Sequence, residues 1–423
     1  MERNFKNSGI EWIGEIPVDW RIGQVKHCFT RKNSKSLDDN PIVLSLTRAG
    51  VKVRDISTNE GQLAESYFGY NPVEPYDLLL NPMDLYSGAN CSISYVKGVI
   101  SPAYINLRYI GNNNPKYYDY YFKTQYWSMA LFAHGRGISF DNRWTLNADS
   151  LFRYYIPIPS ISEQCRIAEY LDEKCQEIDS LIEIQEQMID KLKAYRQSVI
   201  SEAVTKGINP NTPVKQSGID WIKVIPSHWN IITPKALFSL RKEKAKEGER
   251  QLTASQQYGV IYQDEYMQLT GAKIVTVMKD FDILKHVESG DFVISMRSFQ
   301  GGLEYSENTG SISSAYVMLI PNLKYVYPRF YRWLFKSSFY INALQSTSNM
   351  VRDGQAMRYS NFVQVPLYVV PLSEQEEIAS YLDEKCAYID RLIDLKQQKI
   401  EKLKDYKKSV IYEAVTGKTN IDL

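Results

Sequence analysis

Four stretches of the sequence carry residue types that could do chemistry, and the first ends like a phosphate-binding loop. Residues 417–419 read GKT; in such a loop the backbone and the lysine would hold phosphate groups and the threonine would bind Mg²⁺. The loop also needs a glycine five positions earlier, where this chain has Tyr412, and a preceding strand, which the sequence does not predict. We therefore interpret residues 417–419 as the C-terminus of a helix, where glycine is common.

The other three stretches each contain carboxylates. Residues 81–84 read NPMD, which is similar to the Asn-Pro-Pro-aromatic loop of amino methyltransferases, but the second proline, the aromatic residue and an upstream glycine-rich cofactor loop are missing. Residues 172–174 and 383–385 both read DEK, as nuclease sites can, yet we expect them on helices and predict a solvated face. The sequence contains no GxSxG, HExxH or paired Cys/His ligand set. It therefore predicts neither a catalytic site nor a metal site in this chain.

The remaining candidates are polar side chains that could bind DNA. Arginine can bind guanine through two hydrogen bonds in the major groove, glutamine and asparagine can do the same with adenine, and lysine can hold phosphates. Basic, glycine-containing loops occur at 133–144, 296–302 and 350–358, and a basic run occupies 241–246. Each loop alone could equally be an ordinary solvated turn, but the first and third occupy equivalent places in the two halves, which favours a shared role. The candidate DNA-binding residues are Arg136, Asn142, Arg143, Lys242, Lys244, Arg297, Gln300, Arg352, Gln355 and Arg358.

The elements that must position these loops follow from an internal repeat. Residues 162–205 match residues 373–416 without a gap, and 28 of the 44 positions are identical. Such repetition indicates two copies of one structural unit. The repeat extends upstream, because SGIEWI, IP and W between residues 8 and 20 return as SGIDWI, IP and W between residues 217 and 229.

Each repeated segment is predicted to be one long helix. Neither contains glycine or proline, and Ser162 and Ser373 are the expected N-caps. Apolar residues recur at steps of three, four and seven, which is typical of a coiled-coil seam. At ~1.5 Å per residue each helix would be roughly 66 Å long, so we predict that the two helices pack on each other and run antiparallel. The predicted interface residues are Ile178, Leu181, Ile182, Ile189, Leu192, Ile389, Leu392, Ile393, Ile400 and Leu403.

Between the framework segments lie two inserts of about 140 residues that match only weakly. Residues 44–51 resemble 252–260, and DLLL at 77–80 resembles DFVI at 291–294. Short β-rich runs alternate with turn residues, and helices are expected near 116–133 and 328–345. The predicted fold class is α+β, with two α/β domains at opposite ends of the antiparallel helices and an internal pseudo-two-fold repeat. The predicted divisions are 1–161 for the first domain, 162–205 for the first helix, 206–372 for a linker and the second domain, and 373–423 for the second helix and tail.

The net charge of +1 is unevenly distributed along the chain. The two helical repeats sum to −7 and the segments between them to +8, which permits a polyanionic partner without requiring one. The five cysteines form no CxxC pair, which indicates reduced structural thiols. No run reaches the roughly 18 apolar residues of a membrane span, and the first residues lack a signal-peptide core, so a cytoplasmic protein is expected.

The repeated framework resembles the specificity (S) subunit of type I restriction-modification systems. The shared marks are the SGI-[ED]-W-I opening of each half, the SEQ and YLDEK at each helix start, and the KLK, SVI and EAVT toward each helix end. The resemblance covers essentially the whole chain, and each mark is present twice. It implies that the inserts are two target-recognition domains, which differ between members of the family and from each other.

The resemblance also implies a function. The chain would be a DNA-binding subunit, not itself an enzyme, that reads a bipartite double-stranded DNA sequence with one domain per half-site. It would dock two methyltransferase (M) subunits and motor-nuclease (R) subunits. Those partners, and not this chain, would bind S-adenosylmethionine, ATP and Mg²⁺. Two alternatives remain: a coiled-coil scaffold whose end domains bind proteins, and the recognition part of a system fused to its methyltransferase, although no such domain is present here.

Overall fold

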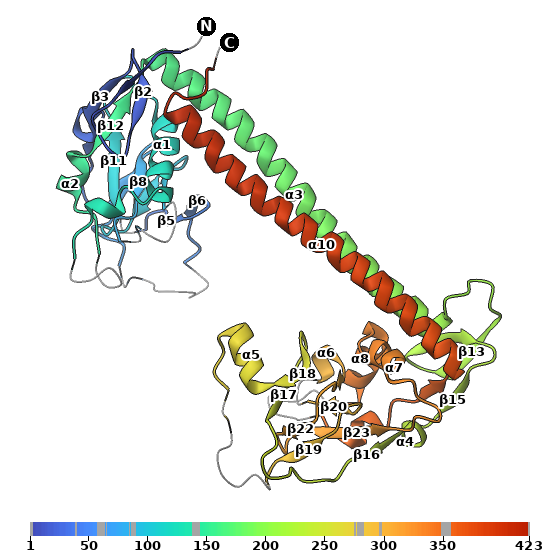
Figure 1. Ribbon diagram of the computed structural model, residues 1–423. Coiled ribbons are helices and arrows are strands. Elements are labelled where there is room, and N and C mark those ends of the chain that lie inside the picture. Colours follow the sequence, from blue (N-terminus) through green and yellow to red (C-terminus); the bar gives the residue numbers. More distant parts are fainter. Residues whose placement is uncertain are drawn as a thin grey trace. The chain divides into compact units, whose positions relative to one another are not determined.

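The computed structural model describes residues 3–38, 40–56, 64, 66–83, 85, 90–137, 144–274, 276, 283–295, 298–347 and 357–421. The chain divides into two compact units (Figure 1). The first unit comprises Met1–Gln185 with Gln398–Leu423, and the second comprises Glu186–Gln397. Within the described ranges, every helix is too short or too polar to cross a membrane.

The first unit is built on a four-stranded antiparallel sheet in the order β4-β11-β8-β9. The central strand β8 is buried at all three positions, as expected for its unbroken apolar sequence LLL. Helix α1 buries the rings of Tyr117, Tyr121 and Phe122 in the same apolar core. It begins at Pro115 because Asn114 caps its free N–H groups. The elements are β1 (Phe5–Asn7), β2 (Glu15–Pro17), β3 (Arg21–Gln24), η1 (Val25–His27), β4 (Phe29–Arg31), β5 (Leu44–Thr47), β6 (Gly50–Val53), β7 (Asn71–Val73), β8 (Leu78–Leu80), β9 (Cys91–Ile93), β10 (Gly98–Ile100), β11 (Ile105–Tyr109), α1 (Pro115–Trp127), η2 (Phe132–His134), α2 (Ala148–Phe152) and β12 (Tyr155–Ile158).

The second unit is built on a four-stranded antiparallel sheet in the order β16-β23-β20-β21. The apolar core joins this sheet to α7 and α8, which are separated at Ser337 because its side chain caps α8. The elements are β13 (Val214–Ile219), β14 (Ile222–Pro226), β15 (Asn230–Ile232), α4 (Pro234–Leu237), β16 (Phe238–Leu240), β17 (Leu252–Ser255), β18 (Gly259–Tyr262), α5 (Gln263–Thr270), β19 (Lys285–Val287), β20 (Phe292–Ile294), α6 (Ser298–Gly301), β21 (Glu304–Tyr305), β22 (Gly310–Ile312), β23 (Val317–Pro321), α7 (Pro328–Phe335), α8 (Ser338–Ser346), α9 (Tyr359–Phe362) and β24 (Leu367–Val369).

The two units share one strand topology. The pairs β1-β2, β3-β12, β5-β6 and β7-β10 of the first unit correspond to β13-β14, β15-β24, β17-β18 and β19-β22 of the second. The weak matches between the inserts fall on corresponding strands, because residues 44–51 and 252–260 contain β5 and β17, and 77–80 and 291–294 contain β8 and β20. Asp77 and Asp291 directly precede the central strand of their sheets and are fully buried. Asp77 forms an ion pair with Lys32, and Asp291 forms one with Arg241.

The predicted long helices are α3 (Ile161–Lys206) and α10 (Leu372–Val415). The predicted N-caps are wrong, because Ser162 and Ser373 lie inside the helices, which begin at Ile161 and Leu372. The cap of α3 is Ser160, whose hydroxyl accepts the N–H of Glu163 at 3.3 Å. Helix α3 ends directly before Gly207 and α10 ends two residues before Gly417; both glycines have a positive φ, which glycine adopts without strain. Residues 417–419 are thus a helix end, as predicted.

Within each unit a segment of α3 lies beside a segment of α10 (Figure 1), and ion pairs fix their direction. In the first unit Lys407 of α10 binds Asp179 of α3 at 2.6 Å. In the second unit Arg196 of α3 binds Asp390 of α10 at 2.9 Å, at the positions equivalent by the repeat. In the second unit Lys396 also contacts Met188 at 3.2 Å. Moving toward the C-terminus on one helix therefore moves toward the N-terminus on the other.

The seam between the helices follows a spacing of three and four residues, which is the coiled-coil pattern. Nine of the ten predicted interface residues are buried or half-buried. The prediction for Leu181 is corrected, because its side chain is 45% exposed and lies at the edge of the seam. It stands one position before the seam residue Ile182, so its side chain points to the edge of the interface. The seam residues are Leu171, Cys175, Ile178, Ile182, Gln185, Ile189, Leu192, Arg196, Val199 and Ala203 on α3, and Leu382, Cys386, Ile389, Ile393, Lys396, Ile400, Leu403, Lys407, Val410 and Ala414 on α10.

Candidate nucleic-acid interface and its attachment to the long helices

Half of the candidate DNA-binding residues can be placed in the structure. Asn142, Arg143, Arg297, Arg352 and Gln355 lie outside the described residues. The other five are all exposed to solvent and lie outside the apolar core: Arg136, Lys242, Lys244, Gln300 and Arg358.

In the first unit Arg136 stands at the base of a loop that is pinned at both ends. Its backbone exchanges two hydrogen bonds with Thr145, at 2.9 and 3.0 Å. The indole N–H of Trp144 donates to the carbonyl of Phe132 at 2.9 Å. The N–H of Leu146 donates to the carbonyl of Pro82 at 2.8 Å, which joins this loop base to the segment after β8. A rigid base of this kind can present an exposed arginine in a fixed direction.

In the second unit the equivalent loop base is held by Asn361. Its amide donates to the carbonyl of Thr347 at 2.9 Å, and its side-chain oxygen accepts the N–H of Arg358 at 3.1 Å. One side chain therefore ties together the two strands of chain that flank residues 348–357. The predicted correspondence between the two loops thus has a structural counterpart, because both lie between the domain helix and the short helix α2 or α9.

The basic run at 241–246 does not act as one patch. Arg241 is largely buried and donates two hydrogen bonds to Asp291, at 2.6 and 3.0 Å, which raise the pKa of the guanidinium. It is therefore committed to the fold. Lys242 and Lys244 remain exposed, and the backbone of Lys244 pairs with Lys285.

The structure also shows what the repeated framework residues do: they attach each insert to a long helix. Trp20 is fully buried and donates its indole N–H to Glu163 of α3 at 2.8 Å. Trp229 does the same to Glu374 of α10 at 3.2 Å. A basic side chain accompanies each pair: Arg3 binds Glu163, and His228 contacts Glu374 at 2.7 Å.

The next repeated residue is a fully buried glutamine. Gln375 accepts the N–H of Tyr327 at 2.7 Å and donates to the carbonyls of Tyr325 at 2.8 Å and Val370 at 2.7 Å. In the first unit Gln164 accepts the N–H of Asn114 at 2.8 Å and donates to the carbonyl of Pro159 at 3.0 Å. Both glutamines bind the residues that precede a domain helix, α1 or α7.

The repeated aspartates of the DEK segments correct the prediction of a solvated face. Asp172 binds Lys116 at 2.5 Å and accepts the hydroxyl of Tyr120 at 2.9 Å, both from α1. Asp383 binds Arg329 at 2.5 Å and accepts the indole N–H of Trp333 at 2.9 Å, both from α7. The signal for these roles was the repetition itself, because Trp, Glu, Gln and Asp recur at equivalent positions in both halves.

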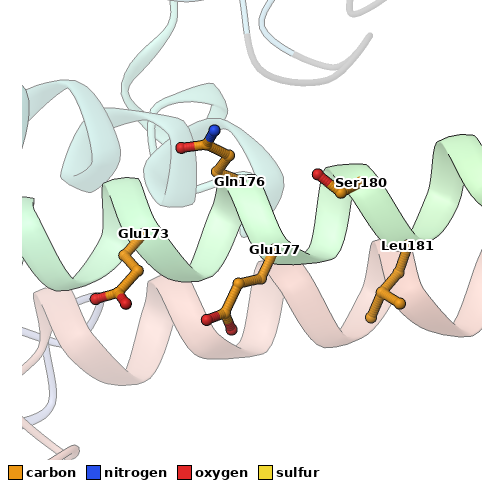
Figure 2. A pocket seen from close by; sticks show the side chains of 5 residues that line it. All are labelled: Glu173, Gln176, Glu177, Ser180 and Leu181. Atoms are coloured by element: carbon orange, nitrogen blue, oxygen red, sulfur yellow. The ribbon is translucent and has the colours of Figure 1, made fainter.

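The glutamate of each DEK segment does lie on an open face. Figure 2 shows Glu173 and Glu177 on α3 in a shallow groove that Gln176, Ser180 and Leu181 complete. The lining of the groove carries two carboxylates and one apolar side chain, and Lys174 binds Glu177 at 2.8 Å.

No group of histidine, cysteine, aspartate and glutamate side chains in the described parts of the chain could hold a metal ion. The thiols are structural in character: burial raises the pKa of Cys28, Cys175 and Cys386, which keeps them protonated. The five cysteines are free.

Comparison with known proteins identifies the relatives of the chain. Residues 226–405 match the model of the family described as the type I restriction modification DNA specificity domain. A Methanocaldococcus jannaschii protein assigned as the MjaX specificity subunit of a type I restriction enzyme is 24% identical, covering 99% of this chain and 97% of its own length. The EcoBI specificity subunit of Escherichia coli is 21% identical, over 87% of this chain and 79% of its own length.

Solved structures agree with this result at the level of the fold. A chain from a study of complex assembly and conformational transition in the type I R-M system superposes with a TM-score of 0.68 at 13% identity, covering 96% of this chain and 99% of that chain. The HsdS subunit from Thermoanaerobacter tengcongensis superposes with a TM-score of 0.54 at 12% identity, covering 96% and 98%. These matches confirm the resemblance to type I restriction-modification specificity subunits that is predicted from the repeated segments.

Proposed function

We propose that this chain reads a bipartite DNA sequence, with one half-site bound by each insert, and that α3 and α10 form an antiparallel coiled coil that sets the separation of the half-sites. The observation that supports this most is the contrast between the units. Their strand order and attachment residues are the same, while their loop sequences differ. Two domains that bind different DNA sequences but attach to the long helices in the same way would have this combination.

Direct reading of bases is assigned to the loops before α2 and α9 and to the segment after β20. Their arginine, asparagine and glutamine side chains match the hydrogen-bonding edges of guanine and adenine in the major groove. Lys242 and Lys244 would contact phosphates and contribute affinity without sequence preference. The pinned loop bases at Arg136 and Asn361 support this assignment, because direct readout requires a fixed direction of approach.

The partners proposed are two methyltransferase (M) subunits and motor-nuclease (R) subunits. S-adenosylmethionine, ATP and Mg²⁺ would be bound by these partners. This chain would then contribute recognition and assembly, and the assembled complex would contribute methyl transfer to adenine and ATP-dependent cleavage.

The experiment that tests the proposal exchanges residues 231–370 for the same insert of a related subunit. The target of each protein is selected from random duplexes in the presence of the M subunits, and the methylated sequence is determined. We expect one half of the target to change and the other half to stay. A change in both halves, or in neither, would show that the inserts do not divide the target between them. Failure to select any DNA sequence, with or without the M subunits, would favour a scaffold that binds proteins.

A further inference from the structure

The two repeated aspartates hold each domain helix in the same way. In each unit a cation and an aromatic side chain, four residues apart on one domain helix, reach a single carboxylate on a long helix. These contacts are Lys116 and Tyr120 on Asp172, and Arg329 and Trp333 on Asp383. Because residues four apart lie one turn from each other on the same face, two such contacts fix both the position and the rotation of the domain helix.

In the second unit the domain helix is also held against the other long helix. The guanidinium of Arg196 on α3 lies 5.7 Å from the centre of the Trp333 ring, within the range of a cation–π interaction. Arg196 is itself oriented by Asp390 of α10. The ring of Trp333 therefore lies between a carboxylate of one long helix and a cation of the other.

These aspartates add little to stability. Their side chains are 40% and 31% exposed, and ion pairs that water can reach contribute weakly. Within each unit, the buried tryptophan and glutamine attach the insert to its long helix. The aspartates instead fix the orientation of the domain helix, because charge-assisted hydrogen bonds from two different groups form only within a narrow range of geometries.

We propose that Asp172 and Asp383 are positioning residues that set the angle at which each insert meets DNA, and through that angle the strictness of the spacing between half-sites. This inference rests on the function proposed above. Helix α1 has 13 residues and is ~20 Å long, so a tilt of ~10° about one end moves the other by ~3 Å, which is about the rise of one base pair. Loss of these aspartate contacts would therefore let the protein bind a DNA site whose half-sites are one base pair too close or too far apart.

The test compares Asp383→Asn and Asp172→Asn with matched controls Glu384→Gln and Glu173→Gln. Each control makes the same chemical change one residue along, on an exposed side chain. The full chain with its M subunits is given the duplex that wild type selects and two duplexes whose spacer is one base pair longer or shorter. The quantity measured is the ratio of the dissociation constants for altered and selected spacing, with melting temperature recorded in parallel.

We expect this ratio to fall about fivefold in each aspartate variant, equivalent to about 1 kcal/mol, and to stay unchanged in both controls. Arg329→Gln and Lys116→Gln break the same ion pairs from the other side and should act alike. A lower melting temperature with an unchanged ratio in these variants would show a merely structural role and overturn the inference. The proposed function fails separately, if wild type selects no bipartite sequence at all.

Discussion

Shortening both long helices together should change the preferred spacing of the target by a definite amount. The perturbation is a matched deletion of residues 183–186 and 394–397, which are equivalent by the repeat. It removes Gln185 and Lys396 from the seam and brings Ile189 three residues after Ile182, so that an apolar side chain follows on the same face. On α10 the equivalent deletion brings Ile400 three residues after Ile393.

The magnitude follows from helix geometry. Four residues account for ~6 Å of rise and for one turn plus ~40° of rotation. One base pair of B-DNA accounts for ~3.4 Å and ~35°, and two account for ~7 Å and ~70°. The rotation therefore matches the loss of one base pair, and the shortening lies between one and two. We expect the deleted protein to select the same two half-sites with one fewer base pair between them.

The assay is selection from random duplexes with the M subunits present, followed by methylation of duplexes with graded spacers. A control deletes residues 183–186 alone. Asp179 and Arg196 can then no longer both face Lys407 and Asp390, and we expect a lower melting temperature and weaker DNA binding. An unchanged spacing after the matched deletion, in a folded protein, would refute the spacer role of the helices.

Three further predictions concern single side chains. Ile189→Ala and Ile400→Ala should each lower the free energy of unfolding by about 2–5 kcal/mol in chemical denaturation, whereas the exposed Leu181→Ala should cost under about 0.5 kcal/mol; equal losses would contradict the seam. Arg352→Ala should cost roughly 1–3 kcal/mol of binding and relax one base pair of one half-site, while Lys242→Ala should weaken all sequences alike and reduce the salt dependence; the reverse pattern would contradict the assignment. Burial raises the pKa of Glu304 despite the neighbouring Lys336, so its protonated form stabilises the fold at low pH and that contribution is lost as pH rises from about 4 through the raised pKa. Glu304→Gln should remove this decline, measured as the difference in stability between variant and wild type; parallel curves would contradict it.

The sequence was most informative where its two copies agree. The long helices were predicted over 162–205 and 373–416, and they span Ile161–Lys206 and Leu372–Val415, because an unbroken apolar stripe without glycine or proline has few other structures open to it. The mixed composition of the inserts was also predicted from short β-rich runs. The arrangement of the two units, the domain boundaries and the DNA-contacting loops stay predictions.

Local and tertiary details were harder to predict. The helix expected near 328–345 is two helices, since Ser337 supplies a cap in the middle of the apolar pattern. Leu181 fits a seven-residue repeat as well as Ile182 does, and only the register of the partner helix decides between them. Asp172 and Asp383 were interpreted as solvated because their partners lie about 50 residues away in sequence, on domain helices whose sequences differ.

The buried glutamines limit how the joint between insert and helix can fail. Gln375 makes three hydrogen bonds where water does not reach, and a buried group left unsatisfied costs about 1–3 kcal/mol. A domain that slipped along α10 by one residue would lose the hydrogen bonds to Tyr325 and Tyr327 together, whereas one that swung about Tyr327 would keep the bond to Tyr327. The attachment of the insert to α10 therefore resists sliding along the helix more than it resists rotation. Under the function proposed above, errors in DNA recognition should accordingly be errors in the angle of the insert, and a half-site displaced along the helix axis should not be read.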